Sequence, residues 1–162
     1  MPNRVRVADE VWIATALLHR QHPDAEDFTV GQIVRRAWSE NITAAESLRP
    51  GVQVHAYLHC VANKPPNPGR YRMLTETAKG RRRLYRPGDP VDPGRSAGKD
   101  RPQDDAVPSR YRFLIDWYLH EYVGDGERSV ADPILSLQGL GKEIWADEDA
   151  DAYVHRLREG WL

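Results

Sequence analysis

The sequence of 162 residues predicts a mainly α-helical fold with one small β-hairpin. Three observations support this prediction. Apolar residues recur at helical spacing in several segments, a run of arginines follows a Gly-containing turn, and 12 prolines interrupt the chain between these elements. Hydrophobic residues make up 40% of the chain, which allows a real core, and the single cysteine excludes a disulfide framework.

Three helices are expected in the first part of the chain. The first covers about residues 7–21, whose apolar side chains form one stripe. The second begins after Thr29, a good N-cap residue, and runs to about Glu40. The third covers about residues 52–62 and ends before the prolines of residues 64–69.

A hairpin is expected next, with strands at residues 71–75 and 81–86 around a turn near Gly80. Three helices followed by a hairpin is the element order of a winged helix-turn-helix. We therefore predict a winged-helix nucleic-acid-binding domain at residues 1–90. A Pro-rich linker (91–108) and a helical C-terminal extension (109–162) follow, with helices at about 109–123 and 149–159.

Charge is unevenly distributed behind the net charge of −1. Residues 1–86 contain 14 Lys or Arg and 8 Asp or Glu, whereas residues 102–162 contain 6 and 13. A basic half suits an anionic partner such as DNA. The acidic half suits a solvated surface, a protein-binding arm, or an internal competitor for the basic face.

The most basic segment is residues 64–86, in which eight Lys or Arg stand against Glu76 alone. Strand alternation places Arg81 and Arg83 on one face and Arg82 with Leu84 on the other. We predict that Arg81, Arg82 and Arg83 contact phosphates while the preceding helix contacts bases; the alternatives are a solvated charge run and an RNA or other polyanion partner. The predicted DNA contacts are Arg35, Arg36, Arg49, Gln53, His55, Tyr57, Lys64, Arg70, Arg72, Lys79, Arg81, Arg82, Arg83 and Arg86.

The segments EVWIA (10–14), FTV (28–30), VANKPPNPGRYRML (61–74) and GRRRLYRPGD (80–89) resemble a little-characterised family of prokaryotic winged-helix domains. The resemblance covers about residues 8–95. It implies the fold and nucleic-acid binding, and it brings no known operator and no catalytic residues.

The segment DPILSLQGLGKEIWADEDADAYVHRLREGW (132–161) is similar to the C-terminal arms of bacterial type II antitoxins. Those arms neutralise toxins, often PIN-domain ribonucleases, although a winged helix is not the usual DNA-binding end of such proteins. Its large aromatic anchors suit an interface, and its arginines could compete with the metal of a nuclease site. Packing on the chain's own helices and homodimerisation are the alternatives. The predicted partner-binding residues are Leu135, Leu137, Leu140, Trp145, Tyr153, Arg156, Arg158 and Trp161.

Enzymatic patterns are weak, and we expect no enzyme, cofactor or metal. His55 and His59 have the spacing of zinc ligands, but no third ligand is evident nearby, and Cys60 is expected to be a structural thiol. No run approaches the roughly 18 apolar residues of a membrane helix. We predict a cytoplasmic, antitoxin-like transcriptional regulator that binds double-stranded DNA and, on a palindromic operator, dimerises. The alternative is an accessory module of a defence system whose tail dimerises without a toxin.

Overall fold

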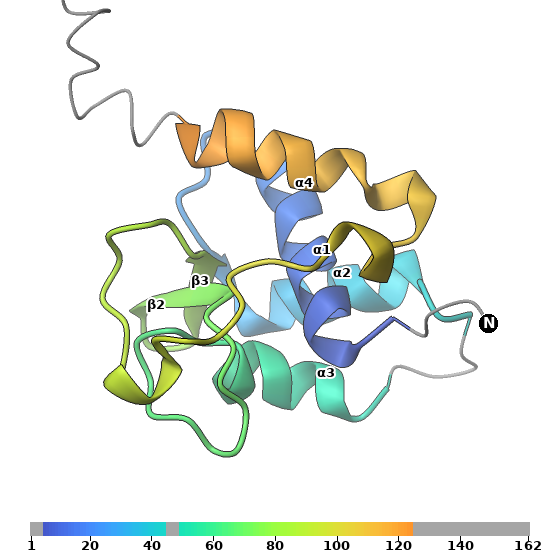
Figure 1. Cartoon of the computed structure of the whole chain (residues 1–162). Helices are drawn as coiled ribbons and strands as arrows, with labels where there is room; N and C mark the ends of the chain where they lie inside the picture. The colour runs from blue at the N-terminus through green and yellow to red at the C-terminus, as the bar shows by residue number, and fades with distance from the viewer. Residues whose placement is uncertain (1–4, 45–48, 125–162) are drawn as a thin grey trace, which may run out of the picture. The chain divides into compact units, whose positions relative to one another are not determined.

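The computed structural model describes residues 5–44 and 49–124, in which helices pack to one side of a small antiparallel sheet (Figure 1). The helices include two π-helical turns, which continue α3 and α4, and three short 3-10 turns. None of the described helices has the length and apolar character needed to cross a bilayer. The elements are α1 (Val7–Gln21), β1 (Phe28–Thr29), α2 (Val30–Glu40), α3 (Gly51–Val54) with the turn His55–His59, β2 (Leu74–Ala78), β3 (Arg81–Leu84), the 3-10 turns Pro93–Arg95, Asp104–Ala106 and Ser109–Tyr111, and α4 (Phe113–Trp117) with the turn Tyr118–Tyr122.

The start of α2 confirms the N-cap that the sequence predicted. The Thr29 hydroxyl accepts a hydrogen bond from the Gln32 backbone N–H at 3.1 Å, and the Gln32 side chain accepts one from the Thr29 N–H at 2.8 Å. This reciprocal capping box satisfies two backbone donors that a helix otherwise leaves without partners. The helix ends at Glu40, and the C-cap residue Asn41 adopts a left-handed conformation with φ 42°.

The sheet has three strands in the order β1–β3–β2, so the expected hairpin is extended by one strand. Phe28 of β1 lies opposite Arg82 of β3. A strand of two residues shows no alternation, which explains why the sequence did not predict it. Strand β2 begins at Leu74, three residues later than expected. At its start the backbone N–H groups of Met73 and Leu74 both donate to the Cys60 carbonyl, so the segment before the strand is tied to the end of the α3 helix. Gly80, with φ 73°, makes the turn between β2 and β3.

Helix α1 lies at the centre of the core, where Val11, Trp12 and Ile13 are fully buried. It packs against α2, α3 and α4 (Figure 1). The ring of Trp12 meets the ring of Tyr118 edge to face, with 5.6 Å between centroids. Tyr122 adds a hydrogen bond from its hydroxyl to the Leu84 carbonyl at 2.8 Å. The expected helix at 109–123 is therefore present, and it belongs to the same compact unit as the first three helices, a unit that runs to Val123.

The Pro-rich segment of residues 91–108 is packed against the domain, in contrast to the linker that its composition predicted. Its Asp92 donates a backbone hydrogen bond to the Ala62 carbonyl at 2.8 Å, and the Lys99 carbonyl accepts one from Arg72 at 2.9 Å. The side chain of Val107 is 2% exposed. Composition alone does not separate an irregular but ordered segment from a free linker, because both are rich in Pro and Gly.

His19 joins α1 to the sheet from a buried position. Its Nε2 atom accepts a hydrogen bond from the Leu84 backbone N–H at 3.2 Å, which fixes the neutral tautomer. Its ring packs against the rings of Phe28 and Tyr122, each with a centroid distance of 4.9 Å. Burial, aided by the positive charge of Arg86, lowers the pKa of His19 from 6.5 to about 4.

We predict that His19 makes the domain less stable below about pH 6.5. The unfolded chain binds a proton at this residue below its ordinary pKa of 6.5, whereas the folded chain does so only near 4. The contribution of neutral His19 to the free energy of unfolding is therefore complete above pH 6.5. It falls by about 3 kcal/mol as the pH falls to 4. Urea unfolding at a series of pH values measures it.

The His19→Gln variant, which cannot titrate, should show a flatter pH dependence than the parent. His22→Gln is the matched control, because His22 is exposed at the end of the same helix. Equal pH dependence in the parent and His19→Gln would contradict this assignment.

Candidate nucleic-acid interface

Helix α3 and its π-helical turn have one buried and one exposed face. Val52 and Ala56 are fully buried. On the other side Gln53 is exposed, Val54 is 46% exposed and Tyr57 is 52% exposed. Exposed valine and tyrosine side chains on one short helix form a surface that suits contact with a partner.

Two buried arginines hold the C-terminal end of this helix. Arg82 of β3 donates to the Tyr57 carbonyl at 3.1 Å, and Arg95 donates to the carbonyls of Leu58 at 2.9 Å and His59 at 2.7 Å. The last carbonyls of a helix have no N–H partner within it, and positive charge is favourable there. The arginines therefore satisfy the helix end and fix its position.

Arg95 also ties the helix end to two other segments. Its guanidinium donates to the carbonyls of Lys64 at 2.6 Å, Pro65 at 3.2 Å and Tyr71 at 2.6 Å. The side chain is 0% exposed, and among the described residues no carboxylate pairs with it. Burial lowers its pKa from the ordinary value. Five carbonyl acceptors thus take the place of a counter-ion.

Sequence reasoning missed Arg95, because a lone arginine among Gly and Pro resembles a solvated loop residue. The neighbouring glycines are the signal that could have found it. A Cβ on Gly94 would lie 2.7 Å from Pro66 Cγ, and a Cβ on Gly98 would lie 1.7 Å from the Arg70 carbonyl oxygen. Both positions require glycine because another part of the backbone or a proline ring approaches so closely.

Tyr57 lies where α3 meets the hairpin. Lys64 Nζ is 4.5 Å and Arg82 Cζ 5.5 Å from the centroid of its ring. Both cations pair with Glu76 Oε2, at 3.0 and 2.8 Å. The Asn63 side chain in turn bonds the backbone N–H and carbonyl of Glu76, each at 2.9 Å. These contacts place the hairpin beside the exposed face of α3.

The three arginines of the hairpin are held by carboxylates of the domain, which corrects the prediction that all three contact phosphates. Arg82 shares the buried face of β3 with Leu84, as alternation predicted, and it is 0% exposed. It therefore has no access to phosphate. The three ion pairs are Arg81 with Asp27 at 2.6 Å, Arg82 with Glu76 at 2.8 Å and Arg83 with Asp89 at 2.7 Å.

The sequence did not predict these ion pairs because two of the carboxylates lie outside the basic segment of residues 64–86. Asp27 is 54 residues from Arg81 in the sequence, and Asp89 lies beyond the segment that was counted as basic. The hydrogen bond from Arg81 lowers the pKa of the Asp27 carboxyl, so this acid stays ionised and keeps its partner. The charge excess of residues 64–86 is thus partly neutralised by residues outside it.

Five more predicted DNA contacts have partners within the chain. Arg49, for example, donates to Glu10 at 2.7 Å and to the Val5 carbonyl at 2.9 Å, which fixes the chain two residues before α3 begins. The five, with their partners, are Arg36 (Glu40), Arg49 (Glu10), His55 (the Gly51 carbonyl), Arg72 (the Gly98 carbonyl) and Arg86 (the Tyr122 ring).

Three predicted DNA contacts, Arg35, Arg70 and Lys79, are exposed. Within residues 5–44 and 49–124 no carboxylate forms an ion pair with any of them. Lys79 lies at the hairpin turn, which is tied to the start of α2 by a hydrogen bond from Val30 N–H to the Gly80 carbonyl at 3.0 Å. Arg35 reaches back over the first turn of α2, since a Cβ on Gly31 would lie 3.9 Å from its Nη1 atom.

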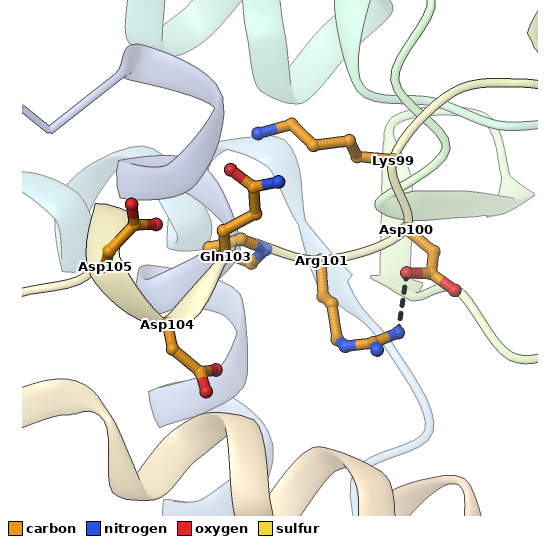
Figure 2. A pocket seen from close by; sticks show the side chains of 7 residues that line it. Lys99, Asp100, Arg101, Gln103, Asp104 and Asp105 are labelled. Atoms are coloured by element: carbon orange, nitrogen blue, oxygen red, sulfur yellow. Dashed lines mark hydrogen bonds and ion pairs between the residues drawn. The ribbon is translucent and has the colours of Figure 1, made fainter.

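A hollow of about 570 Å³ lies in the Pro-rich segment (Figure 2). In it Arg101 pairs with Asp100 at 3.0 Å, while Asp104 and Asp105 are set apart from this pair (Figure 2). In the described part of the chain no three acidic, His or Cys side chains gather as a metal site would require. The residues that line the hollow are Lys99, Asp100, Arg101, Pro102, Gln103, Asp104 and Asp105.

Cys60 is fully buried, and burial raises the pKa of its thiol. This is the structural thiol that the sequence predicted. The predicted partner-binding residues of the tail, which all belong to residues 132–161, lie outside the described residues.

No protein-family model matches this chain, and neither does any curated protein or solved structure. The two family resemblances therefore stay predictions from the sequence.

Proposed function

We propose that this chain is a DNA-binding protein of the winged-helix type, in which α3 enters the major groove and the β2–β3 hairpin is the wing. The observation that best supports the proposal is the exposed face of α3, which is fixed beside the hairpin through Arg82 and Glu76. The element order of helix, strand, two helices and two strands, with β3 at the centre of the sheet, agrees with it.

In this proposal the arginines of the hairpin shape the wing, and other cations contact the phosphates. Lys79 lies at the hairpin turn, and Arg35 lies over the start of α2, which is hydrogen-bonded to that turn; both are exposed. Lysine and arginine contacts to phosphate supply affinity that depends on salt and little on sequence. Base contacts fall to Gln53 and its neighbours on α3.

The Lys79→Ala variant tests this arrangement. We expect it to weaken binding to duplex DNA several-fold for all sequences alike, because a phosphate contact carries no base information. The slope of log affinity against log salt concentration should fall in magnitude by about 1. Fluorescence anisotropy titrations at several salt concentrations measure both quantities.

Arg112→Ala is the matched control. Arg112 is an exposed cation at the start of α4, so its loss changes the net charge by the same amount away from the proposed interface. If both variants changed affinity and salt slope equally, binding would reflect net charge alone and the arrangement would be wrong.

We further propose that the chain is an antitoxin-like transcriptional regulator, whose residues 132–161 bind and silence a nuclease. The support is the sequence of that segment, with its acidic character and its large anchors Trp145, Tyr153 and Trp161. In such a protein the arm would bind free toxin while the other domain binds DNA. The level of free toxin would then control expression of the genes for both proteins.

A chain that ends at residue 131 separates the two roles. We expect it to keep its affinity for DNA, because the described domain ends before the deletion. We also expect it to lose the ability to rescue growth when a nuclease encoded beside its gene is expressed. Unchanged rescue would contradict toxin binding by the tail and favour dimerisation or self-packing of that segment.

A further inference from the structure

The exposed face of α3 bears no charged side chain. Gln53 and Val54 occupy its first turn, and Tyr57 follows one turn later. Val54 and Tyr57 are about half exposed, at 46% and 52%. The face therefore offers an amide, an aliphatic group and a phenol to whatever it meets.

The cations around this helix are committed to other contacts. Arg49, just before the helix, is held by Glu10 and the Val5 carbonyl. Arg82 and Arg95, at its end, are both 0% exposed. None of the three reaches across the exposed face without leaving its hydrogen bonds. Lys64 lies over the Tyr57 ring and pairs with Glu76, at the side of the helix toward the hairpin.

These side chains match one kind of base pair in the major groove. Guanine is most often recognised there by an arginine or lysine that reaches O6 and N7, and the face of α3 has neither. Adenine is recognised by a glutamine or asparagine amide, which donates to N7 and accepts from the N6 amino group. Thymine carries a methyl group that apolar side chains contact.

We propose that α3 selects A·T base pairs, with Gln53 bound to adenine and Val54 packed against a thymine methyl group. The inference rests on the proposed binding of DNA by this helix. Residues in the first turn of a recognition helix are those that contact base edges, which is where Gln53 and Val54 lie. Tyr57, one turn later and beside Lys64, faces the phosphate side of the groove.

Selection from a pool of duplexes, each randomised over one helical turn, gives the first test. The full chain should enrich duplexes with A·T pairs at the contacted positions. The best duplex should bind about tenfold tighter than its counterpart with G·C pairs there, which corresponds to one well-made base contact.

Base analogues then separate contact with base edges from recognition of duplex shape. Replacing the contacted adenine by 7-deazaadenine removes the N7 acceptor. It should weaken binding of the parent several-fold and leave Gln53→Ala unaffected. Replacing the thymine by deoxyuridine removes the methyl group, and should weaken the parent but not Val54→Ala. Gln53 and Val54 are both exposed, so their variants should fold as the parent does. The matched exposed controls are Gln103→Ala for Gln53→Ala and Leu119→Ala for Val54→Ala, and both should respond to the analogues as the parent does.

Three outcomes would overturn the inference. Enrichment of G·C pairs, or no enrichment, would remove the preference while leaving DNA binding intact. Equal loss with the analogues in the parent and the variants would show that A·T pairs are selected through duplex shape and not through Gln53 and Val54. Failure to bind any duplex in the pool would overturn the DNA-binding proposal itself.

Discussion

The guanidinium of Arg95 lies where three parts of the domain meet. It donates to carbonyls at the end of the α3 helix, to those of Lys64 and Pro65 after the helix, and to that of Tyr71 before β2. A guanidinium has five N–H groups in a fixed plane, so it can satisfy several carbonyls at once where a lysine cannot. Apart from the Leu58 carbonyl, which also accepts from the Val61 backbone N–H, these carbonyls depend on Arg95 for the hydrogen bonds described here. Each one left buried without a donor would cost about 1–3 kcal/mol. The packing of the Pro-rich segment and the position of α3 both depend on this contact.

Much of the positive charge in residues 1–95 is used within the domain. Arg82 and Arg95 act on the end of α3, while Arg81 and Arg83 of β3 are paired with Asp27 and Asp89. Many of the cations that make this half of the chain basic thus hold the domain together. The part of the charge that is left for a nucleic acid is small and lies at exposed positions such as Lys79. In the proposed DNA-binding role, affinity should accordingly be modest at physiological salt and depend on contacts made by α3.

Local sequence signals predicted the helices of residues 5–44 and 49–124 well and the ion pairs poorly. The bounds of α1 and the capping of α2 follow from apolar spacing and from Thr29, which are local properties. Alternation also placed Arg82 on the buried face of β3. The partner of Arg81 could not be predicted, because Asp27 is brought to it only by the pairing of β1 with β3. The same holds for Arg95, whose five acceptors come from carbonyl groups that every sequence contains.

Urea unfolding of the Arg95→Met variant tests most directly whether this arginine organises the domain. Methionine keeps much of the side-chain volume and removes every donor. We expect the free energy of unfolding to fall by at least about 3 kcal/mol, since several buried carbonyls lose their hydrogen bonds. Arg70→Met, at an exposed arginine of the same basic region, should change it by no more than about 0.5 kcal/mol. Equal stability of the two variants would contradict the role assigned to Arg95.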